Sequence, residues 1–540
     1  MPRLHSWMRT VRDPDVVYTR RWYILGVLNL SLVIIVAGNS SLNVALPTFV
    51  RELHATNSQL EWIVDAYSLV FAGLVLPMGA LGDRFGRKGL LQAGLLLFAA
   101  AALAGSMATA PWHLIATRAV MGVGAAMIMP ATLSIVTNVF PPRERAKAIA
   151  IWAGFAGAGV SIGPIASGFL LDHFWFGSVF FINVPIIAVA LAAGAFIVPS
   201  SRDPLHRSLD VVGSLLSILG LGSLVYALIQ APDRGWSDGA ILAGFGIAAV
   251  LLALFVVWER RSDHPMLPIE QFADRRFSAG AGGIALTFFA MFGLFFIVTQ
   301  YLQFVLGYSP LRAGAAILPM AGMMIVMAPR SAPLAERYGR NRVMGTGLIL
   351  IAGGMLVMAT LSPTSAYLSV AVALVLFGAG IALTTAPATG AIMESMPLAK
   401  AGVGSAVNDT TREVGGALGV AVLGSILATG YRHHLASHLV GAPKAVATLA
   451  RQSVGSAIAA SHSLPPAAGR SLSTAARRAF TDGMSIVFVA AAGVAVLTAV
   501  LELVAMPGRR EREAQLTALD ELGAAAAAVP AARAEVQATP

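Results

Sequence analysis

Residues 79–88 read GALGDRFGRK, and this stretch decides how the rest of the chain is interpreted. It joins two long apolar segments through a turn that carries Asp83, Arg84 and Arg87. Gly86 lies among these charges and allows the backbone to turn sharply, because glycine adopts angles that other residues resist. A short cationic turn between two apolar segments is typical of a cytoplasmic loop between membrane-spanning helices.

A second copy of this stretch lies far along the chain, where residues 332–341 read APLAERYGRN. Asp83 and Glu336 are 253 residues apart, and so are Gly86 and Gly339. A constant offset of this length indicates an internal repeat, and repeated helix bundles are a common plan for transporters. The sequence therefore predicts two related halves.

The composition indicates a membrane protein. The chain has 540 residues, of which 57% are hydrophobic and 12% charged, whereas a soluble domain carries about 25% charged residues. Cysteine is absent, which excludes a disulfide framework and a thiolate metal site. The net charge is +10, but the basic residues gather in short loops between apolar segments, where the positive-inside rule places them. We therefore expect no nucleic-acid partner.

Fourteen membrane-spanning helices are expected, because about 20 apolar residues cross a bilayer. They lie near residues 22–46, 60–81, 89–109, 112–138, 146–171, 178–199, 210–230, 238–258, 277–305, 311–330, 342–361, 366–390, 402–428 and 483–506. Lysine and arginine alternate between successive loops, which puts both termini in the cytoplasm of a multi-pass protein of the cell inner (plasma) membrane. The exception is the loop from Tyr431 to Asp482, which is expected outside although it is basic.

The offset between the two copies also predicts the domain organisation. It maps the first span onto the ninth and leaves spans 7 and 8 without counterparts. The fold class is therefore all-α, with two six-helix bundles and a two-helix insert. The expected divisions are a cytoplasmic N-terminus 1–21, an N-terminal bundle 22–200, an insert 201–276, a C-terminal bundle 277–506 with an external loop 430–482, and a cytoplasmic tail 507–540.

Four charged residues inside the expected spans stand out as candidates: Asp65, Arg118, Asp409 and Glu413. Each costs about 2.5–3.5 kcal/mol at mid-helix on insertion scales, so such residues are usually functional. Asp409 and Glu413 are four residues apart and share a helix face, while Arg412 is expected to point elsewhere. A carboxyl group that alternates between H+ and a cationic ligand would couple the two. The alternatives are a structural aspartate near a helix start, snorkelling acids near the interface, and a structural ion pair.

The fifth expected span, at residues 146–171, is rich in glycine. Gly159, Gly163 and Gly168 allow neighbouring helices to approach closely. Pro164 is expected to bend the helix. Close packing and a gate at the interface between the bundles are both consistent with this pattern.

Aromatic and methionine side chains offer a second kind of candidate, the lining of a cavity for flat apolar cations. The alternative for each is a place in the core or against lipid. The candidates are Trp62, Tyr67, Phe155, Met291, Phe292, Phe296, Tyr301 and Met323. The chain contains no phosphate-binding loop of the G-x-x-x-x-G-K-[ST] type, and no segment outside the spans is large enough for a catalytic domain.

Four motifs, in the correct order, resemble those of the major facilitator superfamily. They are SLNVALP in span 1, GALGDRFGRK after span 2, LIATRAVMGVGAAMIMPATLS in span 4 and GVSIGPIASG in span 5. Within the superfamily the chain resembles the fourteen-span drug:H+ antiporters, and especially exporters of the QacA, SmvA and EmrB type. This likeness rests on WIVDAYSLVFAG in span 2 and VNDTTREVG in span 13. The chain departs from the group at Gly38, where an aspartate is frequent, and at Ser167, where a second glycine is usual.

The resemblance implies a proton-coupled exporter of lipophilic cations, such as quaternary ammonium biocides and dyes, that works by alternating access. It implies proton coupling or substrate binding at Asp65, Arg118, Asp409 and Glu413. No catalysis, metal or cofactor is expected, since the proton gradient supplies the energy. The expected partners are the lipid bilayer, small-molecule drugs and H+, and a periplasmic adaptor is left open. Gating is expected at Gly79, Gly82, Asp83, Arg84, Gly86, Arg87, Gly159, Gly163, Pro164, Gly168, Glu336, Arg337, Gly339 and Arg340.

Two other functions stay open at this point. An exporter of an endogenous lipid or metabolite would have the same fold, and a basic rather than acidic pocket would favour it. An integral-membrane transferase would need paired acids or a His–Asp set at the external helix ends. Asp172 and His173 are the one hint of such a set in the sequence.

Overall fold

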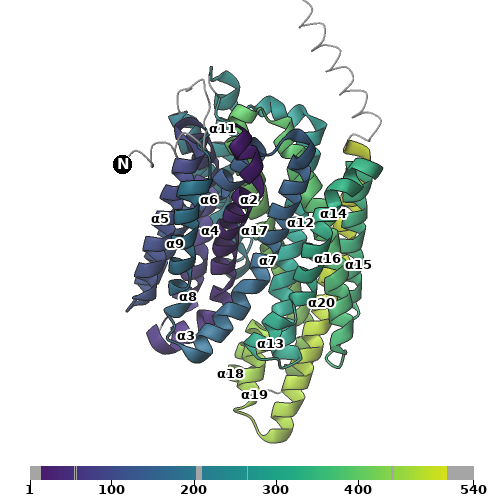
Figure 1. The fold of residues 1–540 in the computed structure, drawn as a ribbon. Helices are drawn as coiled ribbons and strands as arrows, with labels where there is room; N and C mark the ends of the chain where they lie inside the picture. Colours follow the sequence, from purple (N-terminus) through teal and green to yellow (C-terminus); the bar gives the residue numbers. More distant parts are fainter. Residues whose placement is uncertain are drawn as a thin grey trace, which may run out of the picture.

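The computed structural model describes residues 14–53, 55, 57–201, 210–263, 265–439 and 443–506. Throughout this part of the chain the regular structure is helical, and fourteen helices are long and apolar enough to cross a membrane. The all-α fold and the number of spans are therefore as predicted (Figure 1). The expected tail 507–540 and most of the expected N-terminal segment 1–21 lie outside the described residues.

The N-terminal bundle is built around six spans. The first span is interrupted, since α2 ends at Ser40 and a shorter helix follows it directly. The sixth is also broken near Ile182, where the last turn of a short helix meets the next. The helices are α2 (Pro14–Ser40), α3 (Leu42–Leu53), α4 (Asn57–Phe85), α5 (Arg87–Ser106), α6 (Pro111–Val139), α7 (Pro142–His173), α8 (Ser178–Phe181) and α9 (Asn183–Ile197).

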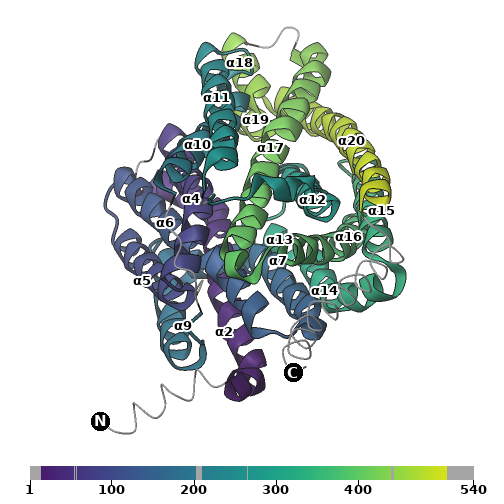
Figure 2. The same cartoon turned by 90° about the horizontal axis from the view of Figure 1, so that it is seen from above.

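The C-terminal bundle and the insert complete the fold. The insert consists of α10 (Val211–Arg234) and α11 (Gly239–Arg261). The helices of the C-terminal bundle are α12 (Arg275–Gln300), which the π-helix η2 (Tyr301–Val305) extends, α13 (Pro310–Ala315), α14 (Leu318–Tyr338), α15 (Arg340–Ala359), α16 (Tyr367–Ser395), α17 (Ala401–Ala436) and α20 (Pro466–Ala505). Seen from above, the two bundles lie side by side, with α7 and α17 near their junction (Figure 2).

The insert helix α10 packs against helices of both bundles, α4 on one side and α17 on the other. Near its outer end the Tyr226 ring stacks on Trp62 of α4, with 6.4 Å between ring centroids. Trp236, which follows α10, donates a hydrogen bond of 2.9 Å from its indole to the hydroxyl of Ser425 in α17. The insert therefore lies across the junction of the bundles rather than on the far side of one of them.

Two helices extend beyond the apolar segments that predict them. The expected spans 402–428 and 483–506 correspond to α17, which continues to Ala436, and α20, which begins at Pro466. The extensions pack on each other and on the short helices α18 (Lys444–Gln452) and α19 (Val454–Ser461). Hydropathy marks where a helix meets lipid, whereas these ends are stabilised by packing on one another outside the apolar segment. Most of the expected external loop is therefore helical.

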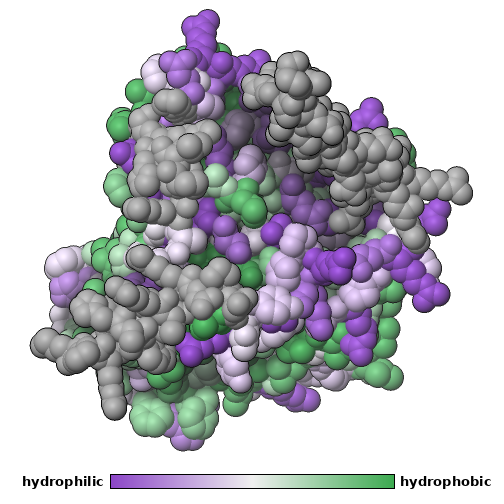
Figure 3. Space-filling model, turned by 45° about the horizontal axis from the view of Figure 1, so that its top comes forward, coloured by the Kyte–Doolittle hydropathy of each residue, from purple (hydrophilic) through white to green (hydrophobic). Residues whose placement is uncertain are grey.

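The end of the molecule at which α2 begins and α20 ends also carries the turn between α4 and α5 (Figure 1). Hydrophilic side chains gather on this end, while hydrophobic ones lie along the flank below it (Figure 3). This distribution suits a bundle whose flank meets lipid and whose end meets water.

Candidate functional site

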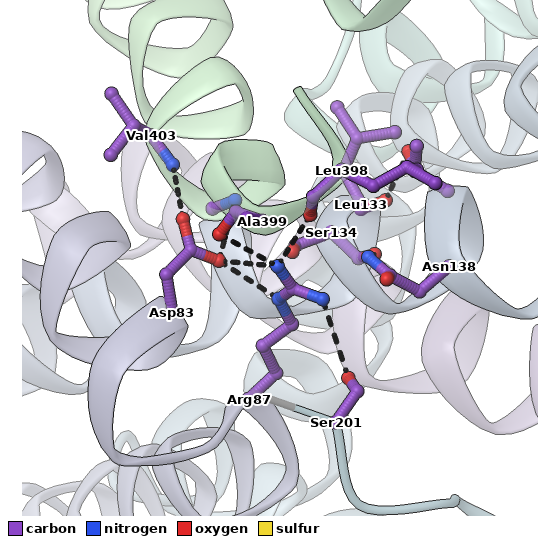
Figure 4. A network of polar contacts seen from close by, with 11 residues as sticks. Asp83, Arg87, Leu133, Ser134, Asn138, Ser201, Leu398, Ala399 and Val403 are labelled. Carbon is purple, nitrogen blue, oxygen red and sulfur yellow. Dashed lines mark hydrogen bonds and ion pairs between the residues drawn. The ribbon is translucent and has the colours of Figure 1, made fainter. Parts of the chain in front are cut away.

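Asp83 at the end of α4 makes a tight contact with the start of α17 in the other bundle (Figure 4). Its two carboxylate oxygens accept hydrogen bonds from the backbone N–H groups of Gly402, at 2.9 Å, and Val403, at 3.1 Å. An acid from another helix thus satisfies the orphan N–H groups of a helix N-terminus, where negative charge is favoured. We refer to Asp83, Arg87 and residues 398–403 as the latch.

Arg87 completes the latch from the first turn of α5. Its Nη2 lies 2.7 Å from Asp83 Oδ1 and donates to the carbonyl oxygen of Leu398 at 2.9 Å. A longer bond of 3.3 Å reaches the carbonyl of Ala399. The side chains of both partners are almost fully buried, with 2% of the arginine and 7% of the aspartate exposed. Each charge is therefore paired and hydrogen-bonded, as a buried ion pair requires.

Two glycines let the helices approach closely enough for the latch to form. A Cβ at Gly79 would lie 2.5 Å from the carbonyl oxygen of Gly402, so any side chain there would force α4 and α17 apart. Gly86 has φ 117°, a value that favours glycine, and it separates α4 from α5. The predicted glycine turn is confirmed, and it sets Arg87 at the start of α5.

The second copy of the motif has the same backbone but different contacts. Gly339 separates α14 from α15 with φ 92°, and Arg340 begins α15 as Arg87 begins α5. Arg340, however, pairs with Glu394 of α16, within its own bundle. Glu336, the counterpart of Asp83, is exposed. The repeat therefore extends to the turn and the arginine but not to the contact across the bundles.

Arg118 is wholly buried at the centre of the N-terminal bundle. Its Nη2 donates a hydrogen bond of 2.6 Å to Asn39 Oδ1 of α2, and its Nε donates one of 3.1 Å to the carbonyl of Ile63 in α4. The guanidinium also lies over the Tyr67 ring, 4.2 Å from the centroid. Arg118 thus ties α2, α4 and α6 together, and Tyr67 in turn lies within electrostatic range of Glu413 on α17.

Asp409 and its neighbours on α17 form a buried cluster of charges. Asp409 is 1% exposed, and its Oδ1 lies 3.9 Å from Arg412 Nη1 and 3.3 Å from the amide nitrogen of Asn408. The same Asn408 accepts a hydrogen bond of 2.9 Å from Thr389 of α16. Glu413 is half-buried and within electrostatic range of both Asp409 and Arg412. Three charges therefore share one stretch of α17.

The expectation that Arg412 points elsewhere is wrong. Arg412 is three residues after Asp409, and this spacing brings two side chains together on a helix as well as the spacing of four does. Its guanidinium lies 4.9 Å from the centroid of Trp152 in α7 and 5.0 Å from that of Phe288 in α12. Neither ring was among the predicted aromatic candidates, because nothing in the sequence relates their helices to α17.

Asp65 lies on α4 and is half-buried. It is two residues from both Ile63 and Tyr67, so it lies on the face of the helix opposite to the residues that hold Arg118. It precedes Asp83 by 18 residues, which is five helical turns, or about 27 Å along the axis.

The glycine-rich span corresponds to α7, which packs on both bundles. A Cβ at Gly159 would lie 3.0 Å from Val36 of α2, and one at Gly163 would meet Ser40 of the same helix. One at Gly168 would lie 3.4 Å from Leu311 of α13, and the Pro164 ring faces the same short helix. The glycines thus let α7 approach helices of both bundles, while their expected part in gating stays a prediction.

Asp172 and His173, which were expected at an external helix end and considered for a transferase, do not form a pair. Asp172 is exposed, and the His173 ring stacks on Phe169 and contacts that residue's backbone carbonyl at 2.9 Å through Nδ1. Among the described residues, no group of three or more histidine, aspartate or glutamate side chains is arranged to hold a metal ion.

Comparison with known proteins identifies the family of the chain and the similar proteins whose functions are known. The family model of the Major Facilitator Superfamily matches residues 28–420. The chain is 36% identical to the multidrug efflux pump LfrA of Mycolicibacterium smegmatis, over 92% of this chain and 96% of that protein. It is 34% identical to the methyl viologen resistance protein SmvA of Salmonella typhimurium, over 89% of this chain and 97% of that protein.

A solved structure has the same fold at much lower sequence identity. The human organic anion transporter MFSD10 superposes with a TM-score of 0.58 at 14% identity, over 89% of this chain and 99% of that one. This likeness carries the fold only.

Proposed function

The chain belongs to the major facilitator superfamily, and from this premise we propose that it is a proton-coupled exporter of lipophilic organic cations. The names of its relatives support export of several compounds, since they include a multidrug efflux pump and a methyl viologen resistance protein. Methyl viologen is a flat aromatic dication. Transport, rather than catalysis, is the activity that we propose for the whole chain.

One observation carries this proposal: acids lie buried at the junction of the two bundles. Asp409 and Glu413 lie on α17, which packs against α4 and α6 of the N-terminal bundle. A carboxylate in such a place attracts either a proton or an organic cation, and it binds one at the expense of the other. Alternate occupancy by H+ and by the substrate would couple their movements in opposite directions.

Arg118 supports the same mechanism from the other bundle. It is a fixed positive charge that is held by Asn39 and the Ile63 carbonyl and lies over the Tyr67 ring, which is itself within electrostatic range of Glu413. A proton that neutralises or leaves an acid on α17 changes the field across Tyr67, and thereby the attraction between the bundles. Arg118 is proposed to sense the protonation of Glu413 in this way.

The latch supplies the conformational part of the proposal. It joins the bundles at the end where α4 stops and α17 starts, so this conformation is closed at that end. We assign this end to the cytoplasm of a cell inner membrane, with both termini on the same side. Release of Asp83 from α17 would open the substrate path to the cytoplasm, and re-formation of the latch would close it behind the bound cation.

The proton gradient is sufficient to drive export without a nucleotide, metal or other cofactor, and none is included in the proposal. One charge that crosses a potential of 100 mV gains about 2.3 kcal/mol. One unit of pH adds about 1.4 kcal/mol per proton. Exchange of one proton for one monovalent cation moves no net charge, so the pH term alone drives it and sustains a cation gradient of about tenfold for each unit of pH. A second proton in each cycle would add the potential term.

The experiment measures dye transport that is driven by an imposed pH gradient in proteoliposomes of the full chain. We call this movement of dye against protons dye counterflow. Ethidium uptake and lumenal pH are recorded together for wild type, Asp409→Asn, Glu413→Gln and Asp65→Asn. We expect wild type to move dye and protons in opposite directions, and Asp409→Asn to lose the exchange. Asp172→Asn is the matched control, because Asp172 is an exposed acid on another helix. If wild type moves neither ions nor dye across a panel of lipophilic cations, export of an endogenous lipid or metabolite becomes the better proposal.

A further inference from the structure

The guanidinium of Arg412 is enclosed by aromatic rings deep in the junction. The ring centroids of Trp152 and Phe288 lie 4.9 and 5.0 Å from it. Trp152 is fully buried and Arg412 is 5% exposed. Two rings and a carboxylate around one organic cation are the chemistry by which proteins bind quaternary ammonium and related ligands. We call Trp152, Phe288 and Asp409 the cage.

Arg412 makes fewer and longer polar contacts than Arg87 does. Arg87 is 2.7 Å from its aspartate and donates hydrogen bonds to carbonyl oxygens as well. Arg412 is 3.9 Å from Asp409, and its Nε and Nη2 have no hydrogen-bond partner among the described residues. Oxygen Oδ2 of Asp409 also has none there. The Arg87 pair has the short distance and the full set of hydrogen bonds that a structural ion pair needs. The Arg412 pair lacks both, so we do not interpret it as a structural ion pair.

The walls of the cage come from both bundles. Trp152 lies on α7 of the N-terminal bundle, whereas Phe288 and Asp409 lie on α12 and α17 of the C-terminal bundle. The cage is therefore complete only while the bundles are as close as in this conformation. Any rocking of one bundle against the other would withdraw a wall and expose both the guanidinium and the carboxylate.

We propose that the cage is a binding site for a monovalent, delocalised organic cation, and that Arg412 is its built-in occupant in this conformation. The inference rests on the proposed function, and it adds that the substrate must displace the chain's own arginine. A guanidinium and a lipophilic cation compete for the same rings and the same Asp409 carboxylate. Arg412 thus excludes a second cation while the latch is closed, and it refills the cage when the substrate leaves.

The test uses the absence of cysteine from the chain. In Arg412→Cys the single thiol can be converted to a cationic side chain with an aminoethyl methanethiosulfonate, or to a neutral one with the methyl reagent. Binding of radiolabelled tetraphenylphosphonium is measured on the purified full chain at pH 8. Arg432→Cys is the matched control, because Arg432 lies on the same helix but is exposed and donates to the carbonyl of Ala428.

We expect Arg412→Cys to bind tetraphenylphosphonium more tightly than wild type, by between about twofold and about thirtyfold, the range that cation–π contacts span. Aminoethyl modification should return the affinity toward that of wild type, and methyl modification should not. Both modified forms derive from the same folded protein, so a difference between them reports what the longer, positively charged aminoethyl group adds. Trp152→Leu should weaken binding over the same range, and Trp112→Leu, at an exposed ring, should not.

Equal affinities for wild type and Arg412→Cys, or equal effects of the two reagents, would overturn the proposal. A failure of the proposed function looks different, because wild type itself would then show neither binding nor counterflow with any lipophilic cation. If wild type transports the cation but Arg412→Cys binds it with unchanged affinity, the exporter proposal is retained and the proposed binding site at the cage is rejected.

Discussion

The Asp83 carboxylate accepts a hydrogen bond of 2.9 Å from the backbone N–H of Gly402, 319 residues further along the chain. This contact joins the last turn of α4 to the first turn of α17, and so one bundle to the other. It combines an ion pair with a helix N-terminus, and it depends on a close approach that only glycine permits at residues 79 and 402. We therefore expect the strength of this contact to govern whether this end of the molecule opens.

Replacing Asp83 with alanine is expected to open the latched end. The change leaves Arg87 buried without its partner, and breaking a buried ion pair costs about 3–5 kcal/mol. Spin labels at Phe85→Cys, next to the latch on α4, and at Leu398→Cys, a latch residue with an exposed side chain, report the separation by electron–electron double resonance. The Asp83→Ala protein should show a longer distance population than the labelled parent. Glu336→Ala, at the exposed counterpart, should leave the distance unchanged.

A second prediction concerns the helix crossing itself. Gly79→Ala places a Cβ 2.5 Å from the backbone oxygen of Gly402, which no side-chain movement relieves, so the latch should fail to close and transport should fall by at least about tenfold. Dye counterflow measures this loss. Gly89→Ala and Gly26→Ala are the controls, because a Cβ at either position meets nothing within 4 Å. Transport by Gly79→Ala at the rate of these controls would contradict the role of the crossing.

The sequence predicted the parts of this site that belong to a single helix or turn. The lengths of the apolar segments predicted the fourteen spans, and the glycines of the repeated motif predicted the turns at Gly86 and Gly339. The partner of Asp83 was not predictable in the same way. It is a pair of backbone N–H groups, which every residue except proline carries, so no side chain marks it.

Contacts between helices could not be predicted from the sequence either. The pairing of Arg412 with Asp409 follows from their spacing of three residues and could have been predicted. The rings of Trp152 and Phe288 come from other helices, and only tertiary packing fixes how those helices are rotated. The ends of α17 and α20 were missed for another reason. They continue as helices outside the apolar segment because they pack on each other, and hydropathy does not report such packing.

Arg118→Lys is expected to abolish coupled exchange while the protein still folds. A lysine keeps the charge, but its single ammonium cannot reproduce the fork that reaches both Asn39 and the Ile63 carbonyl. Loss of one hydrogen bond to a charged group costs about 1.5–3 kcal/mol. Proton-driven dye counterflow should therefore fall by at least about tenfold. Asn39→Ala also removes one bond, but it keeps the guanidinium over the Tyr67 ring and the bond to the Ile63 carbonyl, so its loss should be smaller. An equal or larger loss in Asn39→Ala would contradict this account.

The extended outer ends of α17 and α20 give a prediction for stability. The single hydroxyl hydrogen of Tyr431 is shared between the carbonyl of Ala450, at 2.8 Å, and that of Ser453, at 3.2 Å, which ties α17 to the short helices α18 and α19. Tyr431→Phe leaves both carbonyls without this donor and should destabilise the outer end by about 1–3 kcal/mol.

Thermal unfolding of the purified protein in detergent measures the effect, and protease cleavage between residues 440 and 462 measures it locally. Tyr23→Phe is the matched control, because the Tyr23 side chain is 72% exposed and makes no such tie. The Tyr431→Phe protein should be cleaved faster and should unfold at a lower temperature than this control. Since Tyr431 lies far from the latch and the cage, dye counterflow at moderate temperature should persist. A loss of transport without a loss of stability would show that the outer helices take part in the transport cycle itself.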